Sequence, residues 1–219
     1  MKRLSEIAYL LRCYKRLPLR TRLFVVVRYL VCPWDDIIDQ ISDSGSVLDI
    51  GCGHGLFLLL AKRRFPRLNC VGIDHDIRKI RLAVTSVRDV NVSFVANTEA
   101  GQLKPSTFDF VTVSDVLYSV PPHRWAEIFS LAHRCLKPNG VLIIKETVEK
   151  PKWKYYICLA QETVALKILK YTKGHSPRLE SVEFYLSQLD ANDFVIREHR
   201  RLDSGYPWPH HMFVAKKGW

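Results

Sequence analysis

From residue 46 onward, short continuous apolar runs alternate with longer segments in which apolar residues recur every three or four positions. Short apolar runs bounded by turn residues predict buried strands, and the longer periodic segments predict helices. The predicted strands are 46–50, 69–74, 92–96, 108–114 and 141–146, and the predicted helices are 55–64, 76–88 and 121–135. This alternation is typical of a doubly wound α/β fold.

The last third of the chain departs from the plain alternation. Residues 153–169 predict one helix that is apolar almost all round, which suits either a buried or dimer-forming helix or the wall of an apolar substrate pocket. A further helix is expected over 179–189. Two closing strands are expected over 194–202 and 211–217, and the loop between them contains Tyr206, Pro207 and Trp208.

The first 44 residues predict a basic helical cap. Amphipathic helices are expected over 2–17 and 20–31, and a short helix over 34–41. Residues 1–30 hold eight Lys and Arg against one Glu. Their net charge of +7 is more than half of the chain's net charge of +11. Three interpretations stay open for this charge: a solvated cap, contact with an anionic membrane surface, or contact with nucleic acid.

The segment Val47–Gly55 combines a strand with a glycine-rich turn, Gly51-Cys52-Gly53-His54-Gly55. Glycine lets backbone come close to a ligand, and an acid roughly 20 residues after such a turn, here Asp74, suits the hydroxyls of a ribose. Together with Val71-Gly72-Ile73-Asp74 and Leu136-Lys137-Pro138-Asn139-Gly140, this segment resembles the successive motifs of class I S-adenosylmethionine-dependent methyltransferases. The resemblance covers residues 45–146.

The resemblance implies a Rossmann-like, doubly wound seven-stranded sheet in a domain over residues 45–219. The cap over 1–44 precedes this domain, and the predicted helix 153–169 becomes a helical insertion after the fifth strand. The resemblance also implies S-adenosylmethionine as cofactor and S-adenosylhomocysteine as its product. The residues that it places around the cofactor are Asp49, Gly51, Cys52, Gly53, His54, Gly55, Asp74, His75, Asn97, Thr98, Glu99, Ser114 and Asp115.

Methyl transfer to an O–H or N–H group requires one proton to be removed, so a base near the acceptor is expected. The candidates are His175, His210, His211, Tyr118 and Glu146. Asp115 has no neighbouring carboxylates after the fourth predicted strand, so no metal is expected. The chain also lacks the Asn/Asp-Pro-Pro-Tyr motif and the nucleophilic cysteine of enzymes that methylate bases, which argues against a nucleic-acid base as acceptor and leaves ribose or tRNA methylation open.

The expected function is methylation of a small or lipid-like, partly apolar acceptor at oxygen. One alternative is an RNA methyltransferase that uses the net charge of +11 to bind phosphates. Another is a catalytically silent partner subunit that only binds the donor. A nicotinamide-dependent dehydrogenase is disfavoured, because the glycines follow a Gly-x-Gly-x-Gly spacing rather than Gly-x-Gly-x-x-Gly.

Cysteines and hydropathy bear on the location of the protein. The six cysteines are scattered without a Cys-x-x-Cys pair, which predicts small, reduced and mostly buried side chains rather than disulfides or a zinc site. No apolar run is long enough to span a bilayer. The expected location is the cytoplasm, with the inner membrane surface as a peripheral alternative, and the oligomeric state stays open.

Overall fold

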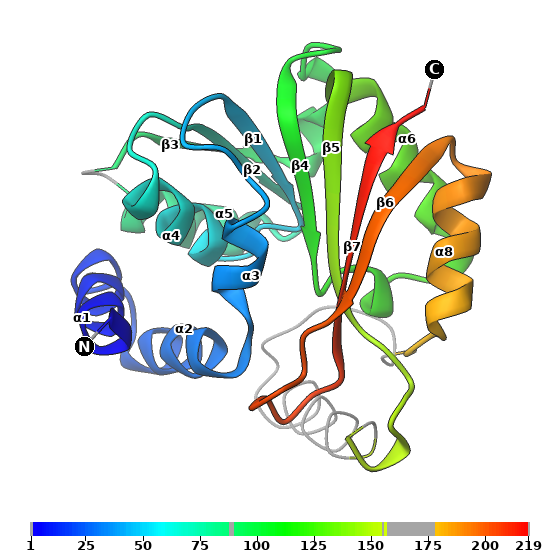
Figure 1. The fold of residues 1–219 in the computed structure, drawn as a ribbon. Helices are drawn as coiled ribbons and strands as arrows, with labels where there is room; N and C mark the ends of the chain where they lie inside the picture. The colour runs from blue at the N-terminus through cyan, green and yellow to red at the C-terminus, as the bar shows by residue number, and fades with distance from the viewer. Residues whose placement is uncertain (1, 88–89, 155, 157–177, 219) are drawn as a thin grey trace. The chain divides into compact units, whose positions relative to one another are not determined.

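The computed structural model describes residues 2–87, 90–154, 156 and 178–218, and Figure 1 draws it as a ribbon. The chain divides into two compact units, residues 1–103 and 104–219. The division into a cap over 1–44 and a domain over 45–219 stays a prediction. Most of the predicted apolar helix 153–169 lies outside the described residues, as do His175 and Cys158.

The first unit contains the three helices of the predicted cap, followed by parallel strands that alternate with helices. Its helices are α1 (Lys2–Cys13), α2 (Leu19–Val31), α3 (Trp34–Ile38), α4 (Leu56–Arg64) and α5 (Ile77–Ser86), and its strands are β1 (Ser46–Ile50), β2 (Asn69–Asp74) and β3 (Val92–Ala96). The strands pair in parallel, with Ile50 opposite Ile73 and Asp74 opposite Ala96. Their carboxyl ends therefore meet at one edge of the sheet.

Two helices of the predicted cap end earlier than the sequence predicts, and one of them is α3, which ends at Ile38 rather than at residue 41. Helix α1 ends at Cys13 rather than at residue 17. Pro18 disfavours helical backbone at Leu17, the residue before it. The chain turns there instead, and the Leu17 N–H donates to the Tyr14 carbonyl at 2.9 Å. Directly after β3, residues 97–102 form a 3₁₀ helix, η1 (Asn97–Gln102).

The second unit begins with a parallel strand pair and ends with an antiparallel one. Its strands are β4 (Phe108–Ser114), β5 (Leu136–Thr147), β6 (Phe194–Arg201) and β7 (His210–Lys217), and its helices are η2 (Leu117–Ser119), η3 (Pro122–Arg124), α6 (Trp125–Cys135) and α8 (Val182–Ala191). Strand β5 pairs parallel with β4 and antiparallel with β7, and β7 pairs antiparallel with β6. The predicted antiparallel closing strands are confirmed.

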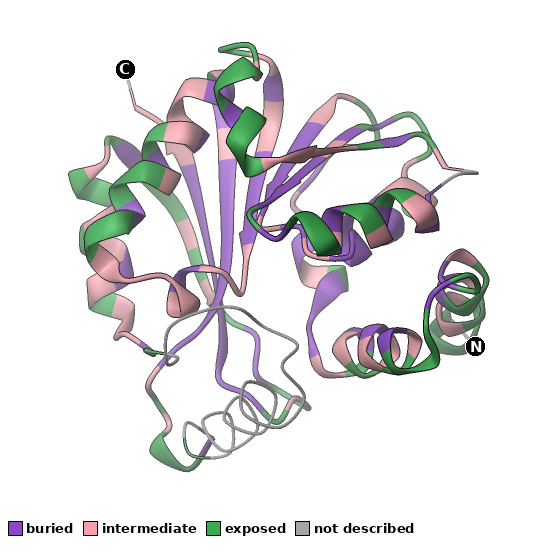
Figure 2. Cartoon of the chain, turned by 180° about the vertical axis from the view of Figure 1, so that it is seen from behind, coloured by how far each residue is buried: buried purple, intermediate pink, exposed green. Residues whose placement is uncertain are grey.

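The strands of the described part form one seven-stranded mixed sheet in the order β3-β2-β1-β4-β5-β7-β6. This order confirms the predicted doubly wound, Rossmann-like fold. The strand centres are buried and the helix surfaces mix buried and exposed residues, as Figure 2 shows. In the second unit, the Trp125 ring of α6 stacks on Tyr185 of α8 at a centroid distance of 5.2 Å, which joins these two helices.

The cysteines and the helix lengths can be compared with the sequence predictions. Cys32, Cys52, Cys70 and Cys135 are buried and Cys13 is half-buried, and none of these five described cysteines forms a disulfide. Their burial confirms the predicted role as small apolar side chains. No helix in the described part of the chain is long and apolar enough to cross a membrane.

Candidate active site

The glycine-rich turn leaves β1 and enters α4. The backbone N–H groups of Gly51 and Cys52 both donate to the Ile73 carbonyl, at 2.8 and 3.0 Å, which ties the turn to the end of β2. Gly51, Gly53 and Gly55 have φ angles of 79°, 56° and 79°. Residues with side chains rarely adopt this left-handed region, so the turn requires glycine at these alternating positions.

Gly53 and Gly55 have different surroundings. A Cβ atom at Gly55 would lie 2.4 Å from Cζ of Phe94, so this glycine is needed for packing against β3. A Cβ atom at Gly53 would meet nothing within 4 Å. Gly53 therefore borders open space at the carboxyl end of β1, which is where open α/β sheets bind ligands.

Asp74 is the last residue of β2, and its side chain holds the glycine turn in place. Its side chain is only 4% exposed. One carboxylate oxygen accepts the Gly53 N–H at 2.8 Å, and the other accepts the Asp76 N–H at 2.8 Å. A carboxylate oxygen has two lone pairs, so each oxygen keeps capacity for one further donor.

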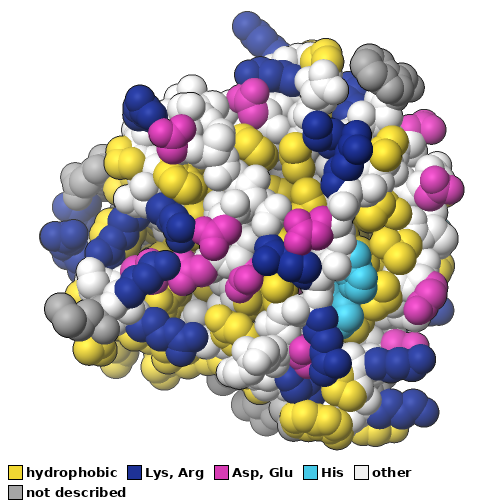
Figure 3. Space-filling view, in the orientation of Figure 1, with side chains coloured by type: hydrophobic (Ala, Val, Ile, Leu, Met, Phe, Trp, Pro, Cys, Tyr) yellow, Lys and Arg dark blue, Asp and Glu magenta, His cyan; other side chains and the backbone are white. Residues whose placement is uncertain are grey.

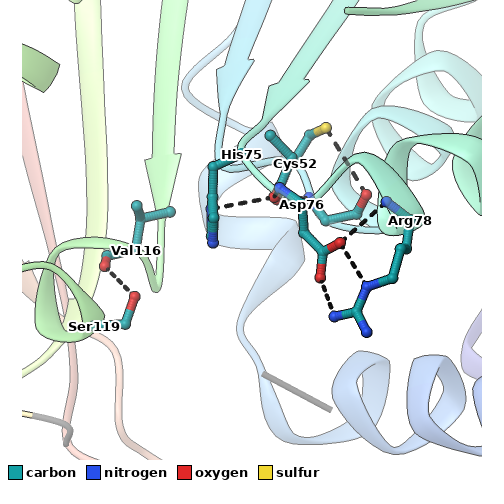
Figure 4. A network of polar contacts seen from close by, with 8 residues as sticks. Cys52, His75, Asp76, Arg78, Val116 and Ser119 are labelled. Atoms are coloured by element: carbon teal, nitrogen blue, oxygen red, sulfur yellow. Dashed lines mark hydrogen bonds and ion pairs between the residues drawn. The ribbon is translucent and has the colours of Figure 1, made fainter. Parts of the chain in front are cut away.

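Asp76, rather than Asp74, is the N-cap residue of helix α5. The Asp76 carboxylate accepts the Arg78 N–H at 3.0 Å and pairs with the Arg78 guanidinium at 2.7 Å (Figure 4). These contacts, above all the side-chain hydrogen bond from Arg78, hold the pKa of Asp76 well below its usual range. The His75 ring is largely exposed, with Nδ1 3.4 Å from an Asp74 oxygen.

The remaining predicted residues of the turn are buried. Asp49 is 3% exposed and Cys52 is 8% exposed. Burial raises the pKa of the Cys52 thiol well above its usual value, so this thiol stays protonated at neutral pH. Burial also lowers the pKa of His54 to about 4, and the imidazole is therefore neutral.

His54 joins the glycine turn to the N-terminal helices, a contact that the sequence analysis missed. The Tyr14 hydroxyl donates to the His54 carbonyl at 2.8 Å, and Tyr14 is 1% exposed. The Phe24 ring of α2 meets the His54 ring edge-on at 5.7 Å. The only signal in the sequence is an aromatic residue on the apolar side of the first helix, which does not identify the partner.

We expect Tyr14→Phe to lower the free energy of unfolding by about 1–2 kcal/mol, because it leaves the buried His54 carbonyl without its donor. Urea unfolding followed by circular dichroism measures this change. Tyr9→Phe is the matched control, since the Tyr9 hydroxyl reaches the Leu59 carbonyl only at 3.4 Å. Equal losses in the two variants would contradict a specific role for the Tyr14 bond.

Three predicted cofactor residues lie beside the Asp74 edge. Asn97, Thr98 and Glu99 begin η1 directly after β3, and all three are exposed. Because Asp74 pairs with Ala96 in the parallel register, these side chains follow the strand next to Asp74 at the same edge of the sheet. The structure thus brings together the predicted residues from three successive strand ends of the first unit.

In the second unit, Asp115 follows β4 in a left-handed backbone conformation with φ of 55°. Its side chain is 1% exposed and forms a salt bridge with the fully buried Lys145 of β5. The Thr147 hydroxyl donates to the other carboxylate oxygen at 3.4 Å. Ser114 precedes this pair, and its hydroxyl oxygen is buried without a hydrogen-bond partner in the described part of the chain.

Glu146 holds the loop that follows β4. One of its oxygens accepts the N–H groups of Val116 and Leu117 at 2.8 and 2.7 Å. The other oxygen is buried and has no hydrogen-bond partner among the described residues. Burial and the nearby Asp115 charge raise the pKa of Glu146 to about 8. The loop then closes on itself as the Ser119 hydroxyl donates to the Val116 carbonyl at 2.7 Å (Figure 4).

The predicted histidines point to opposite faces of the sheet, because side chains alternate along a strand. His210 pairs with Thr147, on the face that carries Lys145, and it meets the Trp208 ring edge-on at 5.6 Å. His211 pairs with Glu146 on the other face. There its Nδ1 lies 2.8 Å from Nε2 of His199.

His211 is held in this position by a neighbouring ring. Burial, followed by the nearby His199, lowers the pKa of His211 to about 4, so the pair shares one hydrogen bond between neutral rings at neutral pH. The His199 ring also stacks on Phe213 at 4.8 Å. Tyr118 is half-buried, and its carbonyl accepts the Arg178 N–H at 2.9 Å. Since His210 and His211 face apart, one acceptor cannot meet both.

Residues 26–198, most of the chain, match the family model described as a methyltransferase domain. The chain belongs to the class I S-adenosylmethionine-dependent methyltransferases. The family resemblance read from the motifs is therefore confirmed, and S-adenosylmethionine is the cofactor of this family.

Two curated relatives of this chain carry names that refer to small molecules. It is 28% identical over 145 residues to trans-aconitate 2-methyltransferase of Acidovorax sp. (strain JS42), a match that covers 65% of this chain and 55% of that protein. It is 27% identical over 147 residues to ubiquinone biosynthesis O-methyltransferase of Idiomarina loihiensis, covering 66% and 59%. The match thus spans little more than half of each relative.

A solved structure supports the fold. The S-adenosylmethionine-dependent methyltransferase of Methanosarcina mazei aligns with a TM-score of 0.65 and 23% identity, covering 84% of this chain and 97% of that one. At this identity the likeness concerns the fold alone.

The first unit of this methyltransferase fits the cofactor. Open space borders Gly53, and the two Asp74 oxygens can each accept one more hydrogen bond. No group of three or more His, Cys, Asp and Glu side chains in the described part of the chain could hold a metal ion. That the reaction needs no metal stays a prediction.

Proposed function

We propose that the protein transfers the methyl group of S-adenosylmethionine to an oxygen atom of a small or lipid-like, partly apolar acceptor. The observation that carries the donor part of this proposal is the glycine turn closed by the Asp74 carboxylate, with open space at Gly53. The names of the trans-aconitate and ubiquinone-pathway relatives support a small or lipid-like acceptor.

In this proposal, different residues of the first unit bind different parts of the donor. Asp74 accepts hydrogen bonds from the ribose hydroxyls, with His75 beside it, and the segment Asn97–Glu99 receives the adenine. The turn Gly51–Gly55 and the buried Asp49 face the amino-acid end. The sulfonium supplies an electrophilic methyl group, so the main task of the protein is to hold donor and acceptor in line.

We assign removal of the acceptor proton to His210 rather than to His211. His210 lies opposite Thr147 at the carboxyl end of β5, on the face of the Asp115–Lys145 ion pair. His211 is occupied by its hydrogen bond with His199 on the other face. Asp115 and Ser114, at the end of β4, support the same region of the second unit.

The test is a transfer assay with S-adenosylmethionine labelled in its methyl group. The acceptors offered are a total lipid extract, a panel of hydroxylated aromatic compounds and small carboxylic acids, and total RNA. We expect label in an extractable small or lipid-like product. His210→Gln should lower turnover about a hundredfold or more, the lower end of what general base catalysis typically contributes, while His199→Gln serves as control.

Three results would overturn parts of this proposal. Label found only in RNA would replace the small acceptor by a nucleic acid. Donor binding without transfer to any of these acceptors would favour a catalytically silent partner subunit. Equal losses in His210→Gln and His199→Gln would remove His210 from the proposed role.

A further inference from the structure

Helix α2 has two apolar faces. Thr21, Val25 and Tyr29 recur at four-residue spacing and are buried. The second face carries Leu19, Leu23, Val27 and Leu30, which are 76%, 63%, 41% and 42% exposed. Figure 2 shows this change between buried and exposed positions along the helix. A helix that only covered its own unit would need the first face alone.

Helix α1 also exposes large apolar side chains. Leu4 is 73% exposed and Leu11 is 36% exposed, seven positions apart and thus on one side of the helix. The two helices are consecutive in the chain and contact each other, as α1 and α2 in Figure 1 show. We call the exposed residues Leu4, Leu11, Leu19, Leu23, Val27 and Leu30 the apolar stripe.

The charges around the apolar stripe are basic. Arg3, Arg12, Lys15, Arg16 and Arg20 are all exposed on or between the two helices. Glu6 is the single acidic residue among residues 1–30, and it accepts a hydrogen bond from the Tyr29 hydroxyl inside the helix pair. Figure 3 shows dark blue and yellow side chains intermixed at the lower left, where these helices lie in Figure 1.

We propose that the apolar stripe and its basic rim dock the protein onto an anionic lipid surface. Leucine and valine side chains favour the acyl boundary of a bilayer, and Lys and Arg favour its anionic headgroups. RNA would use the basic residues but would leave the exposed leucines in water. The proposal concerns where the protein binds and does not depend on the acceptor of the methyl group.

Cosedimentation of the full chain with vesicles tests this proposal. We expect binding to vesicles that contain phosphatidylglycerol in phosphatidylcholine, and at least about tenfold weaker binding to pure phosphatidylcholine. The double variant Leu19→Ser/Leu23→Ser should lower binding about tenfold or more, because it removes two large apolar side chains. Its matched control is Val84→Ser/Val195→Ser, which alters residues 49% and 48% exposed on α5 and β6.

The charge requirement has its own pair of variants. Arg16→Glu/Arg20→Glu should abolish the preference for anionic vesicles, whereas Arg81→Glu/Arg197→Glu changes the net charge equally at exposed sites elsewhere and should retain it. Circular dichroism checks that all variants fold.

Three results would overturn the proposal. The first is no sedimentation with anionic vesicles, or sedimentation that the stripe variant and its control reduce equally. The second is a concentration-dependent dimer that the stripe variant dissociates, which would make the stripe a contact between two copies. The third is salt-sensitive RNA binding that the arginine variant removes while vesicles leave the protein in solution.

Discussion

Asp74→Ala is expected to weaken binding of S-adenosylmethionine about tenfold or more. The Asp74 carboxylate stands at the end of β2, 4% exposed, and fixes the turn through the Gly53 N–H at 2.8 Å. Alanine removes this bond and the proposed charge-assisted hydrogen bonds to the ribose, each of which contributes about 1.5–3 kcal/mol. Calorimetric titration of wild type and variant gives the two dissociation constants.

Asp76→Ala is the matched control for this substitution. It deletes a carboxylate of similar burial two residues away, which caps α5 and pairs with Arg78. We expect it to lower the free energy of unfolding by about 1 kcal/mol, the usual cost of a lost cap, with little effect on donor affinity. If both variants bind the donor equally well, Asp74 has no part in holding it.

Glu146→Gln is expected to change how stability depends on pH. The pKa of Glu146 is raised from 4.5 to about 8 by burial and then by Asp115, against the opposing effect of two backbone N–H donors and Lys145. The folded state therefore keeps the proton that the unfolded state releases. The resulting stabilisation is fully present below pH 4.5 and is lost as the pH rises through about 8.

Glutamine imitates the protonated acid and cannot ionise. Between pH 5 and pH 8, wild type should therefore lose stability relative to Glu146→Gln by up to about 1.4 kcal/mol for each pH unit. Urea unfolding at several pH values measures the difference. Glu127→Gln on the exposed side of α6 is the control, since this residue is solvated. A wild-type-to-variant difference that stays constant with pH would contradict the raised pKa.

The strands and the glycine turn follow from the sequence because local patterns specify them. β1, β2, β3 and β4 begin and end where the apolar runs do. The glycines at positions 51, 53 and 55 adopt the left-handed angles that only glycine takes without strain. The alternation of strands and helices then leaves few possible topologies.

The contacts between distant segments could not be predicted. Tyr14 reaches the His54 carbonyl across 40 positions, and Glu146 reaches Val116 across 30. No spacing or pattern in the sequence identifies either contact, because the packing of whole helices and strands brings the two residues of each pair together. By contrast, the separation of His210 and His211 follows from strand alternation alone, once strand β7 includes both residues.

The most direct measurement is a calorimetric titration of the wild-type protein with S-adenosylmethionine and S-adenosylhomocysteine, beside NAD⁺ and NADH. We expect saturable micromolar binding of the two methionine-derived ligands and no binding of the two nicotinamides. Binding of the nicotinamides alone, or of none of the four, would contradict the donor site at the glycine turn.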